Sequence, residues 1–364
     1  MVLIASWTPI SLTTAATQTL TRSSHALITH AGRAYIFGGE LKARIPVDGA
    51  LHMLDLSSGQ YSSIQIADSV EAPAPRVGTA LAKVGDALYL WGGRGGKEMK
   101  PLSGELWKFE FGKKQGKWEK FAIKGEQPEE RSYHVLTGVQ PVSVFTILLL
   151  SSHNFTFINQ HTLYLHAGCP ASGRLSTLHA LDLKTLTWRS LSPAPEPARG
   201  GTVLASIPSV GSAGSLIRFG GFAGYELGGP LDIYDIAKNK WESVTPLGKE
   251  SPSARSVHAL LGLPNRKGSD LVAVMFSGEG DPAPKELGHD GAGRFLSDVW
   301  GLRWRVGGDW IWEKATLKEN GNVPQPRGWF AKDITENGEI VMQGGLNEKN
   351  ERLGDAWLLN VEEA

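Results

Sequence analysis

A short apolar stretch that ends in two small residues, usually Gly-Gly, occurs six times along the chain and constrains its fold more than any other feature. The six stretches end at Gly39, Gly93, Gly168, Gly221, Gly278 and Gly345. Upstream of each, an arginine opens another apolar stretch, and these arginines are Arg22, Arg76, Arg131, Arg199, Arg255 and Arg327. Because self-similarity at a regular spacing is the signature of a repeat architecture, we predict six copies of one structural unit.

Each copy contains short segments in which apolar and polar residues alternate, which is the pattern of β-strands. A segment such as Leu231–Tyr234 follows the glycine pair, and a further segment often carries a tryptophan. These tryptophans are Trp118, Trp188, Trp241 and Trp312. With 44 glycines and 12 tryptophans, the chain is rich in residues of tight turns and packed strands. Four strands in about 50 residues predict one blade of a β-propeller.

The last copy ends at Trp357–Asn360 without a fourth strand, and the segment Ala5–Thr8 has the pattern of the missing one. Pairing the N-terminal and C-terminal strands in one blade would close the ring and remove an exposed sheet edge. The repeat resembles that of the kelch family over nearly the whole chain. The resemblance implies an all-β fold, a six-bladed kelch β-propeller that forms a single domain over residues 1–364.

One apolar segment, residues 141–160, interrupts the third copy between its first and second predicted strands. Without it, the spacing of that copy matches the spacing from His25 to Gly38 in the first. Two interpretations remain open: a loop that belongs to the native protein, or a segment that was never meant to be translated, such as a retained intron.

Charge and cysteine content exclude several classes of function. The 37 Lys and Arg residues balance 37 Asp and Glu residues, whereas nucleic-acid binders usually carry a basic excess. The single cysteine, Cys169, excludes an intrachain disulfide and a cysteine-rich zinc site. The N-terminus lacks the basic region of a secretory signal, and the apolar run Val142–Leu150 is far shorter than the ~20 residues of a spanning helix. We therefore expect a cytoplasmic protein that binds neither nucleic acid nor membrane.

In an antiparallel four-stranded blade, the start of the first strand and the end of the second lie at the same face. The six repeat arginines and the loops after the glycine pairs should therefore surround one mouth of the central channel, where loops on a rigid scaffold commonly carry function. We predict that these arginines (Arg22, Arg76, Arg131, Arg199, Arg255 and Arg327) bind an anionic substrate. The alternative is that they stack on aromatic rings and bind carbonyl groups at blade junctions.

The loops after the glycine pairs hold the candidate catalytic residues Glu40, Arg94 and Tyr225. The fifth loop, from Glu279 to Gly293, is the longest and contains several carboxylates and a histidine. A histidine with two carboxylates suits Fe(II) or Mn(II) with open coordination positions. The candidate metal ligands are Glu279, Asp281, Glu286 and His289.

This fifth loop resembles that of the plant nitrile-specifier and epithiospecifier proteins, six-bladed kelch proteins that redirect glucosinolate breakdown. Their loop carries the pattern Glu-x3-Asp-x3-His, which is taken to bind Fe(II). The resemblance implies that Glu279 is the first ligand and His289 the last, with Asp281 or Glu286 between them, although the spacing here is two residues longer. It also implies that Arg94 contacts the substrate.

Two kinds of function follow from these features. The first is a small-molecule lyase or isomerase of the specifier type, which rearranges or eliminates from an anionic substrate at the channel mouth and has Fe(II) as its candidate cofactor. The second is a kelch scaffold without catalytic activity, which grips an acidic peptide. Fold alone does not separate them, because propellers host unrelated functions.

Overall fold

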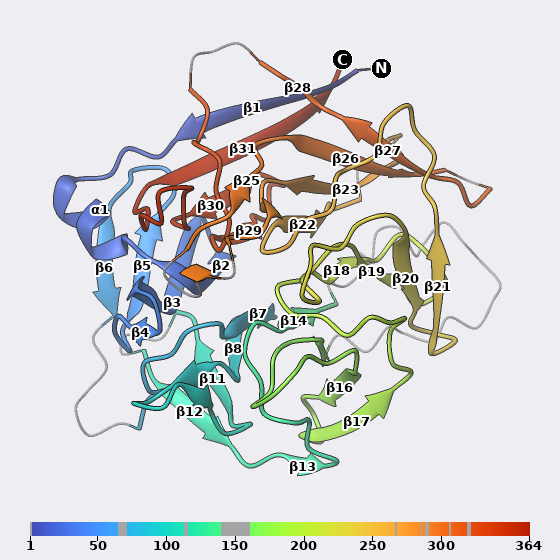
Figure 1. The fold of residues 1–364 in the computed structure, drawn as a ribbon. Helices are drawn as coiled ribbons and strands as arrows, with labels where there is room; N and C mark the ends of the chain where they lie inside the picture. Colours follow the sequence, from blue (N-terminus) through green and yellow to red (C-terminus); the bar gives the residue numbers. More distant parts are fainter. Residues whose placement is uncertain are drawn as a thin grey trace.

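The computed structural model describes residues 2–64, 71–112, 116–139, 161–265, 268–284, 286–287, 291–305, 307–318 and 322–364. Six antiparallel sheets stand around a central axis in it, which confirms the predicted six-bladed β-propeller (Figure 1). The segment 141–160, for which two interpretations remain open, lies outside the described residues. The two strands that flank it nevertheless pair directly, with Gly138 opposite Leu163.

The blades are numbered 1 to 6 along the chain, and each is given from its innermost strand outward. Blade 1 consists of β2 (Ser23–His30), β3 (Arg33–Lys42), β5 (Leu51–Asp55) and β6 (Tyr61–Ile64), with the short β4 (Ile45–Pro46) beside β3. Blade 2 consists of β7 (Ala80–Val84), β8 (Ala87–Trp91), β11 (Leu106–Glu110) and β12 (Trp118–Phe121). Blade 3 consists of β14 (Val135–Gly138), β15 (Thr162–His166), β16 (Leu178–Asp182) and β17 (Thr187–Leu191).

The second half of the ring repeats this arrangement. Blade 4 consists of β18 (Ala205–Ile207), β19 (Ser215–Arg218), β20 (Leu231–Asp235) and β21 (Lys240–Val244). Blade 5 consists of β22 (Ala259–Gly262), β23 (Leu271–Phe276), β26 (Val299–Trp304) and β27 (Trp310–Lys314). Blade 6 consists of β29 (Ala331–Ile334), β30 (Ile340–Gln343), β31 (Ala356–Glu363) and β1 (Leu3–Pro9).

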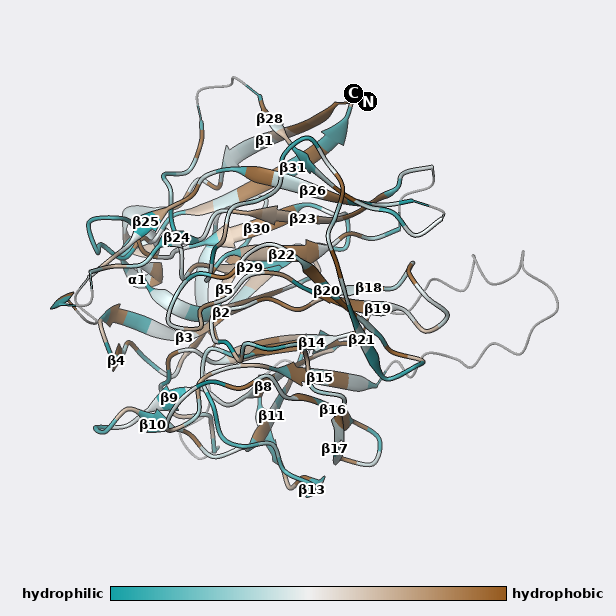
Figure 2. Ribbon diagram, turned by 45° about the vertical axis from the view of Figure 1, so that its right-hand side comes forward, coloured by the Kyte–Doolittle hydropathy of each residue, from teal (hydrophilic) through white to brown (hydrophobic). Residues whose placement is uncertain are grey.

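The N-terminal strand closes the ring, as the sequence predicts. β1 runs antiparallel to β31 as the outer strand of blade 6, with Leu3 opposite Glu363 and Pro9 opposite Trp357. Both views place the two chain ends side by side (Figures 1 and 2). Closure in this way pairs strands that are far apart in sequence and leaves no unpaired sheet edge at the point where the ring begins.

Short linker strands cover the outer edge of two blades. β13 (Lys124–Gly125) pairs in parallel with β17, and β28 (Thr316–Leu317) pairs in parallel with β1. Each linker lies on the edge of the blade that follows it in the ring. Two further hairpins stand at the channel mouth, namely β9 (Arg94–Gly95) with β10 (Lys100–Pro101), and β24 (Glu279–Asp281) with β25 (Arg294–Phe295).

The core lies between adjacent blades, and Figure 2 shows hydrophobic residues concentrated along the strands. Tryptophans on the outer strands fill these junctions: Trp7, Trp118, Trp188 and Trp312 are at most 2% exposed. The only α-helix within the described ranges is α1 (Thr14–Leu20), which connects blade 6 to blade 1. No helix among those ranges is long and apolar enough to cross a membrane.

Three histidines that follow the repeat arginines by three positions pack in these junctions. His25, His134 and His258 are buried, and a Cβ atom added at Gly92 of blade 2 would lie 2.7 Å from the His134 ring. Burial, together with the charge of Arg131, lowers the pKa of His134 to about 3, so its imidazole stays neutral. The recurring histidine is therefore a packing residue that requires glycine on the neighbouring blade.

Candidate functional site at the channel mouth

Six backbone hydrogen bonds form a closed circle around the axis at one end of the channel. Each residue that follows a repeat arginine by two positions donates its N–H to the carbonyl of its counterpart in the preceding blade, at N–O distances of 2.7–3.2 Å. We call this set the inner circle, and it comprises Ser24, Gly78, Tyr133, Gly201, Val257 and Trp329. All six have φ between 46° and 60°. Because Val257 is β-branched, its φ of 46° is a strained conformation that the surrounding circle maintains.

Outside the inner circle, the first residue after each glycine pair forms a second circle, the mouth residues. Each pairs in antiparallel fashion with the residue directly after a repeat arginine. The mouth residues are Glu40, Arg94, Cys169, Phe222, Glu279 and Leu346. Three sequence-predicted residues, Glu40, Arg94 and Glu279, are therefore brought onto one circle from three separate blades.

Two aromatic side chains of the inner circle stand at the centre of the mouth. The rings of Tyr133 and Trp329 meet edge to face with centroids 5.4 Å apart. They come from blades 3 and 6, which are opposite one another in the ring, and both are partly exposed. A ligand at the mouth would therefore rest on an aromatic floor rather than enter an open channel.

The six repeat arginines are buried, with exposed fractions of 7% or less. Each donates from Nη1 to the carbonyl of the first small residue of its own blade's pair, and these carbonyls belong to Gly38, Gly92, Ala167, Gly220, Ser277 and Gly344. Three also bind a carboxylate, as Arg255 does with Asp298 at 2.7 and 2.8 Å. These contacts favour the carbonyl-binding role considered above, and contact with a substrate stays a prediction.

Arg94 has a different environment, because it is only partly buried at the mouth. Its Nη2 donates to the carbonyl of Pro170 at 2.9 Å, while its Nε has no partner among the described residues. Nearby, the guanidinium of Arg174 lies 4.8 Å from the centre of the Phe222 ring. Arg94 and Arg174 thus place two cations on the side of the mouth formed by blades 2 and 3.

Glu40 is buried beside a further cation that sequence reasoning missed. Its Oε1 lies 3.4 Å from Nη2 of Arg352, and its Oε2 accepts the backbone N–H of Arg44 at 2.6 Å. The Arg352 side chain is only 8% exposed, and its Nε has no partner in the described ranges. Position in the repeat could have indicated Arg352, since its backbone pairs with the mouth residue Leu346.

Two carboxyl groups lie on the side of the mouth formed by blades 4 and 5. Glu279 accepts from Gly293 N at 3.0 Å and from Trp329 Nε1 at 3.3 Å, and burial raises its pKa despite these hydrogen bonds. Burial also raises the pKa of Glu226 to about 8, a shift that Ser256 opposes and the Glu279 charge reinforces. Its Oε2 has no partner within the described chain. Glu226 is therefore a neutral carboxylic acid at pH 7.

The predicted metal ligands are not gathered in the described part of the chain. Asp281 is exposed and pairs with Arg294 at 2.8 Å, and Glu286 is also exposed. His289 lies outside the described residues. No three His, Cys, Asp or Glu residues in the described ranges could together hold a metal ion. The side chains that are described do not by themselves fit an Fe(II) site.

The remaining predicted residue, Tyr225, is 59% exposed in the loop that follows Phe222. The structure adds Tyr133, Trp329, Cys169, Glu226 and Arg352 to the mouth. The first three occupy fixed positions relative to the arginine or the glycine pair, so alignment of the six repeats could have found them.

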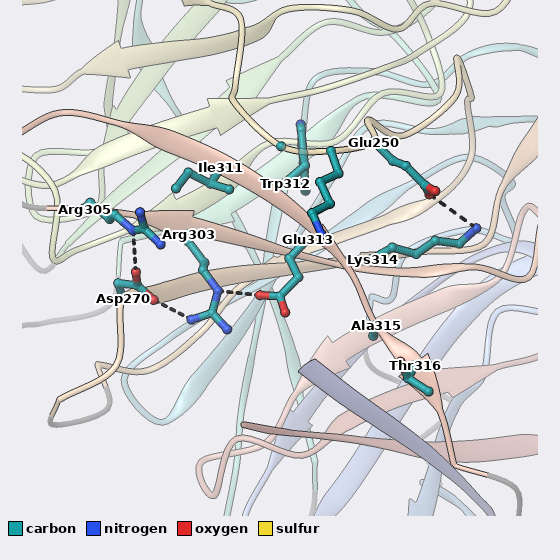
Figure 3. A pocket seen from close by; sticks show the side chains of 12 residues that line it. Glu250, Asp270, Arg303, Arg305, Ile311, Trp312, Glu313, Lys314, Ala315 and Thr316 are labelled. Carbon is teal, nitrogen blue, oxygen red and sulfur yellow. Dashed lines mark hydrogen bonds and ion pairs between the residues drawn. The ribbon is translucent and has the colours of Figure 1, made fainter. Parts of the chain in front are cut away.

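A separate pocket of about 670 Å³ lies at the outer side of blade 5 (Figure 3). At its base, Arg303 pairs with Asp270 and Glu313 of blade 5 and with Glu363 of blade 6. Glu313 in turn accepts the backbone N–H of Leu3 at 3.0 Å. Because these charges satisfy one another and join the closing strands to blade 5, the cluster stabilises ring closure.

Comparisons with known proteins agree with this architecture. A family model described as the KLHDC2/KLHL20/DRC7 Kelch-repeats domain matches residues 2–147. The chain is 26% identical, over 93% of its length and 92% of the relative's, to N-(sulfonatooxy)prop-2-enimidothioate sulfolyase from Thlaspi arvense. It is 26% identical to acyl-CoA-binding domain-containing protein 4 of Arabidopsis thaliana over 65% of its length, but spans only 33% of that protein. The solved structure of YjhT superposes with a TM-score of 0.62 at 15% identity, covering 94% of this chain and 98% of the other, which shows the fold alone.

Proposed function

We propose that this chain, a six-bladed kelch-repeat β-propeller of the specifier-protein type, is a small-molecule lyase or isomerase whose active site is the channel mouth. The observation that carries the proposal is the placement of Arg94, Glu40 and Glu279 on one circle around the floor formed by Tyr133 and Trp329. The relative from Thlaspi arvense is named as a sulfolyase whose substrate bears a sulfonatooxy group, which supports an anionic substrate here.

The anionic group of the substrate would bind on the side formed by blades 2 and 3. Arg94, which is partly exposed, supplies one guanidinium group there, and Arg174 adds a second positive charge. Bidentate guanidinium contacts suit planar or tetrahedral oxyanions such as carboxylate and sulfate. The apolar part of the substrate would lie against Phe222 and the aromatic floor.

The side of the mouth formed by blades 4 and 5 would act on the reacting bond. Glu226 is a neutral acid at pH 7 because its pKa is raised to about 8 by burial, so it can donate a hydrogen bond to an atom that gains negative charge. Donors aimed at developing charge in a partly dehydrated site are a large source of rate enhancement. Elimination or rearrangement would then proceed with the substrate held between Arg94 and Glu226.

An iron(II) ion held by Glu279 and His289, with Asp281 or Glu286, remains a separate proposal. The steps above do not depend on it. Anaerobic calorimetry with Fe(II) on the wild type and on Glu279→Ala/His289→Ala tests this part alone: stoichiometric binding lost in the variant supports the site, and no binding by either protein refutes it.

The catalytic proposal is tested by turnover of N-sulfonatooxy imidothioates, measured with and without Fe(II). We expect Arg94→Gln to lower kcat/KM by about 10- to 100-fold, the effect of one charge-assisted contact, with an unchanged Tm. Arg305→Gln is the control, because Arg305 is 60% exposed at the outer side of blade 5. Equal activity of the Arg94 and Arg305 variants would remove Arg94 from the site.

An acidic-peptide partner is the competing proposal. Since Arg76 and Arg131 are buried and bound to carbonyl groups, their substitution would disturb the blades as well as any peptide site. Arg94→Gln and Arg174→Gln are better probes, because both side chains are partly exposed at the mouth. If wild type binds labelled acidic peptides, loses them in both variants, and turns over no sulfonatooxy compound, the scaffold function replaces the enzymatic one.

A further inference from the structure

Blade 1 differs from the other five blades at one repeated position on the outer strand. In blades 2 to 6, the residue paired with the fourth residue of the third strand is a tryptophan, namely Trp118, Trp188, Trp241, Trp312 and Trp7. In blade 1 the residue at this position, opposite Leu54, is Tyr61. Five tryptophans and one tyrosine therefore occupy equivalent places around the ring.

The smaller tyrosine leaves space where the other blades are filled. Four of the five tryptophans are at most 2% exposed, whereas Tyr61 is partly exposed and lines a pocket of about 330 Å³. The pocket lies between α1 with its preceding residues and the turn before β6. Its lining residues are Ser11, Thr13, Ala15, Ala16, Thr19, Ser58, Gly59, Gln60 and Tyr61, none of which is charged.

A hydrogen-bonded chain fixes the role of the Tyr61 hydroxyl. Its oxygen lies 2.9 Å from His52 Nδ1, and His52 Nε2 lies 3.1 Å from the carboxylate of Asp48. Burial opposes ionisation of Asp48, but the contacts with His52 and Arg22 hold its pKa below the usual range. We assign the His52 proton to Nε2, which faces the Asp48 carboxylate and also lies 3.2 Å from Arg22 Nη2, so that Nδ1 accepts the Tyr61 hydroxyl proton. The lone pairs of the Tyr61 oxygen remain as acceptors.

The equivalent chain of hydrogen bonds is shorter in blades 5 and 6, which carry a tryptophan at the position of His52. Trp300 and Trp357 donate from Nε1 to Asp298 and Asp355 at 2.7 Å. An indole has no second nitrogen, so no hydrogen bond can continue from it. His52 makes the same contact with Asp48. Through its other nitrogen it also orients the hydroxyl of Tyr61, a residue that lines the pocket.

Two other hydroxyl groups of the pocket are likewise committed as donors, whereas Thr13 Oγ1 accepts the backbone N–H of Ala16 at 3.2 Å. Thr19 Oγ1 donates to the carbonyl of Ala15 at 2.9 Å, and Ser58 Oγ donates to Asp55 at 2.9 Å. Ser58 Oγ already accepts the Gln60 N–H at 3.3 Å, so the lone pairs of Thr19 and Tyr61 favour a ligand that donates hydrogen bonds. Because no carboxylate lines the pocket, a cationic donor such as an amine would find no counter-charge.

We propose that this pocket of blade 1 binds a neutral, hydroxyl-rich ligand, a monosaccharide or a sugar moiety, one of whose hydroxyl groups donates to Tyr61. A pocket of this volume is at the lower limit for small-molecule sites and accommodates one pyranose ring. The site is formed by the outer strands and α1, away from the mouth residues, and its ligand takes no part in the reaction proposed there.

The test is ligand-observed saturation-transfer NMR with methyl glucoside, methyl galactoside and methyl mannoside on the full chain. We expect at least one to bind the wild type. Tyr61→Phe, which removes the acceptor and leaves the space, should weaken that sugar about fivefold, the effect of one neutral hydrogen bond. Tyr61→Trp, which restores the residue of the other five blades, should abolish binding.

A variant at another lining residue controls for loss of structure in the two Tyr61 variants. Ala15 lies on the exposed side of α1; Ala15→Leu nearly keeps the helix propensity and reduces the pocket, so it should also abolish sugar binding with an unchanged Tm. Failure of all three glycosides to bind the wild type overturns the proposal. Binding that survives both Tyr61→Trp and Ala15→Leu overturns it as well, because the sugar would then lie elsewhere.

Discussion

Trp329 donates from Nε1 to Glu279 at 3.3 Å while its ring meets that of Tyr133 from the opposite blade. The Trp329 side chain thus joins the aromatic floor of the mouth to Glu279, a candidate metal ligand. The hydrogen bond lowers the pKa of Glu279, against the larger opposite effect of burial.

Trp329→Phe should therefore raise the pKa of Glu279 further, because the aromatic contact is kept while the donor is lost. Carbon-detected NMR titration of labelled glutamate carboxyl groups measures this shift directly. Tyr133→Phe is the matched control, since it changes the floor without touching Glu279. An unchanged Glu279 titration in Trp329→Phe would show that the indole contact does not influence the carboxylate in solution.

Arg255→Met should destabilise the propeller by about 3 kcal/mol, since removing one partner of a buried, hydrogen-bonded pair leaves Asp298 and the Ser277 carbonyl without it. Urea unfolding measures the change. Arg294→Met is the control, because Arg294 and Asp281 are 69% and 65% exposed and such pairs contribute about 0–1 kcal/mol. If Arg255→Met lost as little stability as Arg294→Met, the repeat arginine would not have the structural role assigned to it.

Lys332→Leu should stabilise the protein by about 2 kcal/mol at pH 7. Lys332 stands five residues after its arginine, where the other five repeats have Leu27, Leu81, Leu136, Leu204 and Leu260. Burial lowers the pKa of Lys332 to about 8, so the folded state is penalised while the lysine stays charged.

This effect should depend on pH with a definite sign. Between pH 8 and 10 the unfolded chain keeps the Lys332 proton while the folded chain releases it, so wild-type stability rises with pH. The advantage of Lys332→Leu should accordingly shrink over that window. Lys249→Leu, at an exposed position, should show no such trend. Parallel pH profiles for wild type and Lys332→Leu would contradict the assignment.

Arg303→Met should weaken ring closure, because it leaves Glu313 and Glu363 without their shared cation. We expect a loss of about 3 kcal/mol and faster amide exchange in β1 and β31 than in blade 3. The control is Arg305→Met, whose side chain is 60% exposed at the edge of the same pocket (Figure 3). Uniformly faster exchange in every blade would show a general rather than a local effect.

The repeat made most of the fold predictable. Six arginines, six small-residue pairs and alternating strands gave the blade count, and Ala5–Thr8 gave the closing strand, which the structure extends to Leu3–Pro9. These features repeat because the strands of each blade pack in the same way, so the pattern of one blade predicts the other five. The mouth position of Glu40, Arg94 and Glu279 followed from strand direction alone.

The sequence by itself determined the architecture, the closure and which loops meet at the mouth, because strand alternation and repeat spacing are local properties of the chain. Only the tertiary structure decided what each polar side chain does. It turned the six repeat arginines inward to carbonyl groups, brought Arg352 beside Glu40, and gave Glu226 its raised pKa. Those outcomes depend on burial and on partners from other blades, and the spacing of residues along one strand determines neither.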